Sequence, residues 1–377
     1  MSDTLVREDQ TLETDADMMM AVRNYGPRDY RLETVSKPTI GPGELLIRVD
    51  ASGICGSDGK CFTGSGMFWG GEDPWVKAPV TPGHEFFGTV VELGEGAAAL
   101  HGLAVGDRAI AEQIYPCTKC RYCKRGQYWM CEVHDIYGFQ GGVADGAWAE
   151  FMKFGVNARI HKVPSDMTLE AGVLIEPLAC AIHAVERGNI QLGDTVVLAG
   201  AGTLGLLMLQ VIKQKSPSLI IVQDVKPERL ELARELGADV GINVKEEDPV
   251  AVVKELTDGY GADVFIEATG YPQAVVNGLN LIRKLGTFVA FGVFGEHTSA
   301  DWSIIGDRKE LNIHGAHLGP YCYPLAIDYL YKGVVNAGAI VTHRLPLSRF
   351  GEGMEMLLRG EGIKIMLEPD AQILGQR

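Results

Sequence analysis

The sequence of 377 residues has no excess of positive charge. It contains 34 Lys and Arg residues against 49 Asp and Glu residues, which gives a formal net charge of −15. Such a chain is repelled by the phosphates of nucleic acids and by anionic membranes, so we expect neither as a partner. The sequence also lacks a charged-then-apolar leader and any apolar run long enough to span a bilayer. We therefore expect a soluble, cytoplasmic protein.

Apolar periodicity is absent from residues 1–17. This segment holds six acidic residues and one arginine, and it is predicted to be a disordered acidic tail. No internal repeat or low-complexity tract stands out in the remainder. A hydrophobic content of 46% supports sizeable cores, and the length is enough for two domains.

A long helical period is missing between about Val22 and His161. Short apolar runs at Leu45–Val49, Gly88–Leu93 and Arg108–Ala111 are separated by Gly and Pro residues. This pattern predicts a compact β domain with long loops.

From about Leu169 onward, strand-like runs alternate with helical patterns. Strands are expected at Val196–Ala199, Leu219–Asp224, Val264–Glu267, Thr287–Gly292 and Leu311–Gly315, and the clearest helices at Leu206–Lys213 and Pro227–Leu236. This alternation favours a parallel, doubly wound sheet, so the predicted fold class is α/β. After about His317 we expect one or two helices and short strands, and a return of the chain to the first domain.

A glycine-rich turn joins the first of these strands to its helix. In Gly200-Ala201-Gly202-Thr203-Leu204-Gly205, the first glycine would make the tight turn, the second would admit a pyrophosphate, and the third would pack helix on strand. The helix N-terminus then offers free N–H groups to phosphates. A dinucleotide site is predicted, and a glycine turn that binds another ligand is the alternative.

Asp224 ends the second strand and suits a hydrogen bond to a ribose 2′-hydroxyl. Because its carboxylate would repel a 2′-phosphate, we predict NAD over NADP, although Lys226 and Arg229 lie nearby. Loops at later strand ends are expected to line the nicotinamide, with plain strand-to-loop connections as the alternative. The predicted cofactor-binding residues are Gly200, Gly202, Thr203, Leu204, Gly205, Asp224, Arg229, Ala268, Phe291 and Val293.

Four of the eight cysteines lie close together in the sequence, at Cys117, Cys120, Cys123 and Cys131. Four thiolates close one tetrahedral site and leave no open position, so this pattern predicts a structural zinc that staples a loop. An iron–sulfur cluster and free thiols are the alternatives.

A second set of metal ligands is predicted at Cys55, His84 and Glu85. Zinc most often accepts thiolate, imidazole and carboxylate ligands, and three protein ligands leave one position open, as catalytic zinc requires. In the alternative interpretation, His84 and Glu85 occupy a tight turn after Pro82-Gly83, and Cys55 is a small buried apolar residue.

These motifs resemble those of the zinc-containing medium-chain alcohol dehydrogenase family. The segment Gly83–Ala97 matches the zinc motif of that family, and Cys55-Gly56-Ser57-Asp58, the four cysteines and the glycine turn stand in the same order. The resemblance implies a GroES-like catalytic domain with a zinc-stapled loop over residues 18–172 and 318–377. It further implies a Rossmann NAD-binding domain over residues 173–317, and a homotetramer.

Glu176 stands where ethanol-type members of the family carry a third zinc cysteine. In having a glutamate at this position, the chain resembles the polyol and threonine dehydrogenases. The polyol branch implies that Cys55, His84, Glu85 and a water surround the metal, while Glu176 binds it directly or holds that water. Ser57 is the candidate that passes a proton toward the cofactor ribose. Cys180 is expected to be a core residue.

Two departures from sorbitol-type members indicate a reshaped substrate pocket. Lys60 replaces a relay histidine, and Leu318-Gly319 stands near the position of an Arg-Tyr pair. Lysine could relay a proton only with a lowered pKa, and we expect Lys60→Ala to keep most activity. The aromatic insert Phe62–Trp75 is expected either to line a smaller pocket or to serve in ordinary packing or a subunit contact.

The predicted function is the zinc-dependent oxidation of a small polyol to a ketose, with hydride transfer to NAD. The overall similarity favours members that act on erythritol and threitol. The alternatives are a threonine-type amino-alcohol dehydrogenase and a noncatalytic, zinc-stapled dinucleotide-binding protein. The second alternative predicts zinc only at the four neighbouring cysteines.

Overall fold

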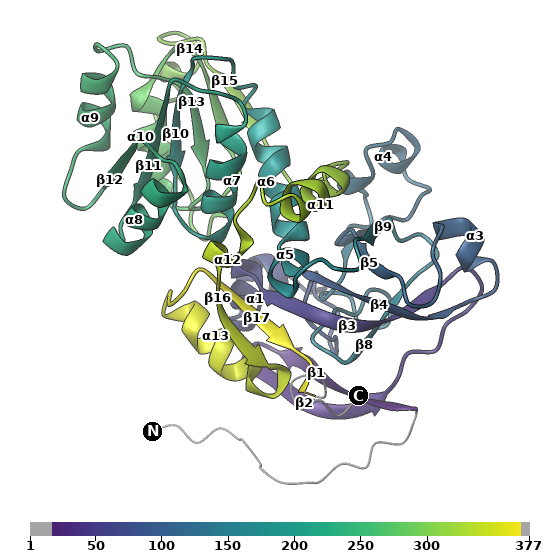
Figure 1. Cartoon of the computed structure of the whole chain (residues 1–377). Coiled ribbons are helices and arrows are strands. Elements are labelled where there is room, and N and C mark those ends of the chain that lie inside the picture. Colours follow the sequence, from purple (N-terminus) through teal and green to yellow (C-terminus); the bar gives the residue numbers. More distant parts are fainter. Residues whose placement is uncertain (1–16, 371–377) are drawn as a thin grey trace.

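The computed structural model of the chain describes residues 17–370. All but the last residue of the predicted acidic tail lies outside the described residues. The described part of the chain contains two large sheets, each with its own helices, which lie in different halves of the molecule (Figure 1). No helix within residues 17–370 is both long and apolar enough to cross a bilayer.

The first large sheet is mostly antiparallel. Among the described residues it has seven strands, in the order β16-β17-β3-β4-β5-β9, with β8 beside β3. Their bounds are β3 (Leu45–Ile54), β4 (Phe86–Leu93), β5 (Arg108–Ala111), β8 (Phe151–Phe154), β9 (Ile160–Val163), β16 (Val341–Pro346) and β17 (Lys364–Glu368). Alternate residues of β3, such as Leu45, Ile47 and Val49, enter one core because side chains of a strand alternate between its faces.

The C-terminal part of the chain completes this sheet. β17 pairs parallel with β16 and antiparallel with β3, where Met366 lies opposite Gly53. In Figure 1 the yellow β17 therefore lies beside the purple β3. This pairing places the last strand next to the start of the helix that follows β3.

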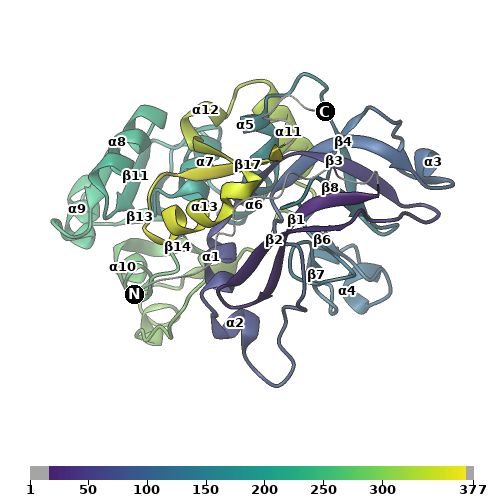
Figure 2. The ribbon, with the colours of Figure 1, turned by 90° about the horizontal axis from the view of Figure 1, so that it is seen from below.

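Short elements surround the first sheet. They are the hairpin β1 (Met18–Gly26) and β2 (Asp29–Ser36), the pair β6 (Ile114–Tyr115) and β7 (Asp135–Ile136), and the helices α1 (Gly56–Phe62), α2 (Gly66–Trp69), α3 (Ala97–His101), α4 (Arg121–Lys124), α5 (Leu169–Val173), α12 (Ala337–Ile340) and α13 (Phe350–Leu358). Short 3₁₀ helices lie at Tyr128–Met130, Trp302–Ile304 and Leu347–Arg349. Figure 2 shows α2 and the loop after it standing out from the body of the molecule.

The second large sheet is parallel throughout. Its order within residues 17–370 is β12-β11-β10-β13-β14-β15, with all pairs parallel. The strands are β10 (Thr195–Ala199), β11 (Leu219–Asp224), β12 (Val240–Asn243), β13 (Ala262–Glu267), β14 (Ile282–Ala290) and β15 (Asn312–Gly315). From β10 the chain first winds toward β12 and then returns toward β15, which is the doubly wound order that binds ligands at its carboxyl edge.

Helices cover both faces of the parallel sheet (Figure 1). They are α6 (Ile175–Arg187), α7 (Thr203–Lys213), α8 (Pro227–Leu236), α9 (Pro249–Leu256) and α10 (Pro272–Leu281), and α11 (Tyr323–Tyr331) packs on α6. Val196 and Leu198 of β10 enter one core, whereas Val197 and Ala199 enter the other. A sheet buried on both faces explains why its strands are continuous apolar runs in the sequence.

The predicted elements differ from the structure in detail. α7 begins at Thr203 and not at Leu206, and β14 begins at Ile282 and not at Thr287. Within the described residues, three helices follow His317 where one or two were expected: α11, α12 and α13. The predicted strand Leu219–Asp224 and helix Pro227–Leu236 have the bounds observed for β11 and α8.

Candidate metal centres and cofactor site

Cys55, His84 and Glu85 form one group. A sulfur of Cys55, a ring nitrogen of His84 and a carboxylate oxygen of Glu85 all lie within 4.8 Å of one another. Cys55 follows β3 and precedes α1, while His84 and Glu85 immediately precede β4. Because β3 and β4 are antiparallel neighbours, the end of one strand meets the start of the other, and Gly53 N donates to Glu85 O at 2.7 Å.

Asp58 holds two members of this group in place. Its Oδ2 accepts a hydrogen bond from Cys55 N at 2.8 Å, and its Oδ1 lies 3.4 Å from His84 Nδ1. Burial opposes a charge on His84, but the Asp58 carboxylate and the Cys55 thiolate raise the pKa of His84 well above its usual value. A metal-ligating histidine typically turns its second nitrogen to a carboxylate in this way, so the donor set fits zinc.

Ser57 lies on the other side of the His84 ring. Its Oγ is 3.3 Å from His84 Nε2, the nitrogen that does not face Asp58. The predicted proton-passing residue is thus in contact with a predicted ligand. Asp58 belongs to the quoted Cys55–Asp58 motif, but its contact with His84 was not foreseen from the sequence.

Glu85 has a buried cationic partner from the C-terminal strand. Lys364 Nζ donates to Glu85 Oε1 at 2.6 Å and to Ile54 O at 3.1 Å, and both charged side chains are only 2% exposed. Burial opposes the charge on Lys364, but the Glu85 carboxylate raises the pKa of Lys364 above its usual value. The carboxylate of Glu85 is therefore shared between Lys364 and the ligand group.

Glu176 lies in the first turn of α6 and is buried. Its Oε1 accepts from Cys180 Sγ at 3.2 Å and from Gln113 Nε2, and Tyr323 holds the Gln113 amide through its hydroxyl. Its Oε2 has no hydrogen-bond partner within residues 17–370. Burial raises the pKa of Glu176 to about 7. Glu176 does not belong to the compact three-residue group, and Cys180, expected as a plain core residue, is one of its hydrogen-bond donors.

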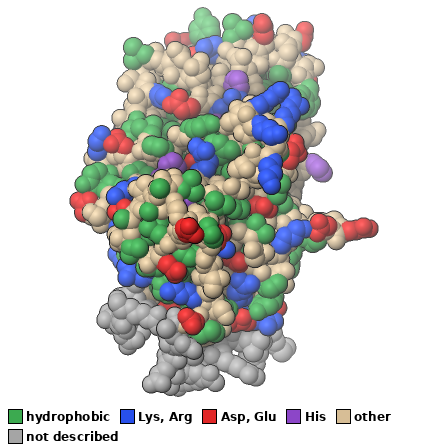
Figure 3. Space-filling view, turned by 90° about the vertical axis from the view of Figure 1, so that its right-hand side faces the viewer, with side chains coloured by type: hydrophobic (Ala, Val, Ile, Leu, Met, Phe, Trp, Pro, Cys, Tyr) green, Lys and Arg blue, Asp and Glu red, His purple; other side chains and the backbone are tan. Residues whose placement is uncertain are grey.

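The four neighbouring cysteines form a second group. Their sulfur atoms lie within 4.8 Å of one another, and none is in a disulfide. Backbone N–H groups point at the sulfurs, with Cys117 N 3.3 Å from Cys131 Sγ and Cys120 N 3.3 Å from Cys117 Sγ. Lys and Arg side chains gather on the face of the molecule that carries α4, which offsets the charge of thiolates (Figure 3). Four convergent sulfurs suit a closed, structural site.

The glycine turn lies at the carboxyl end of β10. Gly200 has φ +104°, which favours glycine, and a Cβ at Gly205 would lie 1.9 Å from Gly200 O. Gly202 caps α7, Thr203 begins it, and Leu204 packs against the core. Asp224 Oδ2 accepts from Ala201 N at 2.7 Å, so the predicted ribose ligand also supports the turn.

The other predicted cofactor residues follow strands at the same edge of the sheet. Ala268 follows β13, and its N–H donates to Ala199 O at 3.0 Å, whereas Phe291 and Val293 follow β14. Lys60 of α1 donates from Nζ to Val293 O, which joins the Cys55 helix to this edge. The structure therefore brings the three-residue metal group and the carboxyl edge of the parallel sheet together.

The aromatic insert packs beside the metal group. Its Phe68 and Trp75 both contact Phe139, with ring centroids 5.4 Å and 5.1 Å away, and Phe139 contacts the ring of His84 at 5.4 Å. The insert thus reaches a predicted zinc ligand through one intervening ring.

Known families match both halves of this chain. Residues 41–165 match the alcohol dehydrogenase GroES-like domain, and residues 203–332 match the zinc-binding dehydrogenase family. The chain therefore belongs to the zinc-binding alcohol dehydrogenases and is an oxidoreductase. This membership, together with a second ligand group outside the four cysteines, argues against the noncatalytic alternative.

Individual relatives narrow the comparison to the polyol branch. The chain is 50% identical to an erythritol/L-threitol dehydrogenase from Mycolicibacterium smegmatis, over 93% of this chain and 98% of that protein. It is 35% identical to a sorbitol dehydrogenase from Halalkalibacterium halodurans, over 92% and 97%. The crystal structure of 2R,3R-butanediol dehydrogenase from Bacillus subtilis has a TM-score of 0.84 at 30% identity, over 93% and 100%.

Proposed function

We propose that this protein oxidises a four-carbon polyol, erythritol or threitol, with a catalytic zinc and NAD. The observation that carries the proposal is the Cys55–His84–Glu85 group, which Lys60 joins to the carboxyl edge of the parallel sheet. The 50% identity to an erythritol/L-threitol dehydrogenase supports this substrate class.

Each residue of the site has a proposed role. Cys55, His84 and Glu85 would hold zinc, whose chemistry as a Lewis acid lowers the pKa of a substrate hydroxyl. Asp58 orients the His84 ring, and Lys364 restrains the Glu85 carboxylate. Ser57, 3.3 Å from His84 Nε2, is placed to pass the hydroxyl proton away from the site.

Glu176 is proposed to act through its free oxygen. Gln113 and Cys180 hold Oε1, so Oε2 remains available to the metal or to a water beside it. The side chain can serve as a direct ligand or as a holder of that water. Cys117, Cys120, Cys123 and Cys131 would hold the second, structural zinc.

The choice of NAD over NADP rests on the surroundings of Asp224. The two nearby cations that could bind a 2′-phosphate are already engaged: Lys226 donates to Gly360 O at 2.5 Å, and Arg229 to Gly362 O at 3.3 Å. The Asp224 carboxylate disfavours a further phosphate. NAD bound there would accept the hydride.

The larger organisation is proposed as follows. The proposed GroES-like catalytic domain comprises residues 18–172 and 318–377, of which 371–377 lie outside the described residues, and the proposed Rossmann domain comprises residues 173–317. The pairing of β16 and β17 within the first sheet supports this division. A homotetramer in the cytoplasm is also proposed. An open edge at β15, with Ile313 and nearby Trp302 exposed, offers a surface for subunit contact.

A substrate panel tests this function. Purified, zinc-loaded protein is assayed with erythritol, threitol, sorbitol and threonine, each with NAD and NADP, before and after treatment with a chelator. We expect the highest kcat/KM for a four-carbon polyol with NAD, loss of activity on chelation, and recovery with zinc. Oxidation of threonine but no polyol would favour the amino-alcohol alternative, and equal use of NADP would contradict the role of Asp224.

A further inference from the structure

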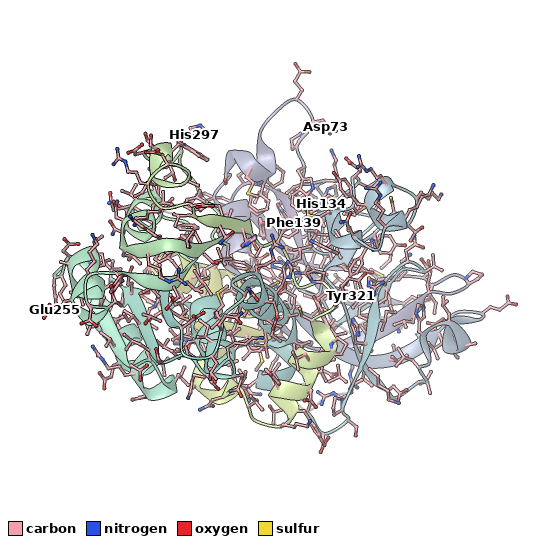
Figure 4. The ribbon with its side chains drawn as sticks, turned by 90° about the horizontal axis from the view of Figure 1, so that it is seen from above. Asp73, His134, Phe139, Glu255, His297 and Tyr321 are labelled. Atoms are coloured by element: carbon pink, nitrogen blue, oxygen red, sulfur yellow. The ribbon has the colours of Figure 1, made fainter. Side chains whose placement is uncertain are left out.

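Two histidines from different parts of the chain meet beside the site. His134 lies just after the four-cysteine lobe and before β7, with φ +57°, and His317 follows β15 at the carboxyl edge of the parallel sheet. Their Nε2 atoms are 3.3 Å apart, and their rings stack with centroids 5.1 Å apart. His134 and Phe139 lie near the middle of the molecule in Figure 4. The pair therefore joins the GroES-like part to the edge where ligands of doubly wound sheets bind.

A continuous row of rings leads from the metal group to this pair. His84 contacts Phe139 at 5.4 Å, and Phe139 contacts Trp75 at 5.1 Å. Trp75 in turn contacts His134, with centroids 6.1 Å apart. Apolar rings separate two polar positions, the metal ligands at one end and the imidazoles at the other. This arrangement suits a molecule with one hydroxyl at the metal and further hydroxyls away from it.

The hydrogen-bonding capacity of the pair is only partly used. Partial burial lowers the pKa of His317 to about 4, so its neutral ring has one donor and one acceptor. Within residues 17–370, His317 has no hydrogen-bond partner besides His134, and the residue remains partly open to solvent. One nitrogen of His317 is thus free for a ligand.

We propose that His317 binds a substrate hydroxyl remote from the carbon that is oxidised, and that His134 positions its ring. His317 is then a residue that selects polyols over alcohols without distal hydroxyls. This inference rests on the proposed oxidation of four-carbon polyols and adds the recognition of the remainder of the substrate. A hydroxyl suits the free nitrogen because it can either donate to it or accept from it.

The test compares the tetritols with a diol that has the same four-carbon chain but lacks the terminal hydroxyls. Erythritol and threitol carry terminal hydroxymethyl groups, whereas 2,3-butanediol keeps the vicinal hydroxyls and has methyl groups at its ends. For His317→Ala we expect kcat/KM for the tetritols to fall about tenfold, mainly through KM, which is the worth of one hydrogen bond. For 2,3-butanediol we expect kcat/KM to change by less than about twofold. If the diol is not oxidised, its inhibition constant is measured in place of kcat/KM.

Matched variants separate recognition from damage to the fold. His317→Asn keeps polar atoms near the position of the ring nitrogen, and it should recover most of the tetritol activity. His297→Ala removes an exposed histidine from the loop after β14 and should resemble the wild type. Equal losses on both substrates, or no loss with the tetritols, would overturn the role of His317 while the proposed function stands. Failure of the wild-type enzyme to oxidise any tetritol would overturn both.

Discussion

At the scale of single residues, the Cys55–His84–Glu85 group is held by a carboxylate that is not one of the predicted metal ligands. Asp58 reaches both Cys55 N, at 2.8 Å, and His84 Nδ1, at 3.4 Å. It therefore fixes the start of the helix that carries the thiol and the orientation of the imidazole. Such outer contacts orient ligands and typically change metal affinity when removed.

The variant Asp58→Asn isolates the charge of this residue. Its amide oxygen can still accept from Cys55 N, but no negative charge faces His84. We expect zinc affinity at the Cys55–His84–Glu85 group to fall about 10–100-fold. Zinc per chain is measured after dialysis against increasing chelator, with the zinc of the four cysteines as the internal reference. If the variant released each zinc at the same chelator concentration as the wild type, the proposed role of Asp58 would be contradicted.

The same scale shows what the sequence could and could not predict. The grouping of Cys55, His84 and Glu85 was predictable because their side chains are ligand types of zinc. Lys364 and Gln113 were not, because each acts through a buried contact with a residue far away in the chain: Lys364 is 279 positions from Glu85, and Gln113 is 63 from Glu176. The one signal for Lys364 was a charged residue at the start of a short apolar run, Ile365–Leu367.

At the scale of elements, strong periodicity gave correct bounds, and weak periodicity gave errors. α8 carries Pro227 at its start and Gly237, with φ +111°, after its end, so both bounds were readable. α7 begins three residues early because the last residues of the glycine turn already adopt helical geometry. The predicted strand began too late in β14 because Arg283, Lys284 and Gly286 interrupt the apolar pattern of its first half. Leu285, in the same stretch, has φ +61°.

The four-cysteine lobe is an element whose fold we expect to depend on metal. Its helix α4 has only four residues and buries none of them, so side-chain packing contributes little to the stability of this helix. We expect Cys120→Ser to lose about one zinc per chain and to expose the segment between Cys117 and Cys131 to proteolysis. Metal analysis and limited proteolysis measure these changes. Cys322→Ser, outside both ligand groups, is the control, and an unchanged zinc content in Cys120→Ser would disprove the closed four-thiolate site.

At the scale of the whole molecule, contacts with the C-terminal segment and with α1 join the two sheets. Thr203 donates to Ile363 O at 2.6 Å, and Arg229 to Gly362 O at 3.3 Å. Lys60 adds a contact from α1 to Val293 O. The residues around the predicted dinucleotide site therefore also set how the catalytic part lies against the Rossmann part. The sequence predicted both parts, but it could not predict these contacts, because they join residues with no local pattern in common.

Lys60 makes a contact between the two parts of the molecule, and we expect it to have no part in proton transfer. Burial lowers its pKa, as a proton relay would require, but its Nζ donates to the Val293 carbonyl and does not face another titratable side chain at hydrogen-bond distance within residues 17–370. We therefore expect Lys60→Ala to keep kcat within about twofold, since a single partly exposed hydrogen bond contributes about 1 kcal/mol or less. Rates across pH 6–10 test this, with Lys245→Ala, an exposed lysine of the Rossmann part, as the control. A large fall in kcat with a shifted pH profile would instead identify Lys60 as the group that carries the substrate proton to solvent.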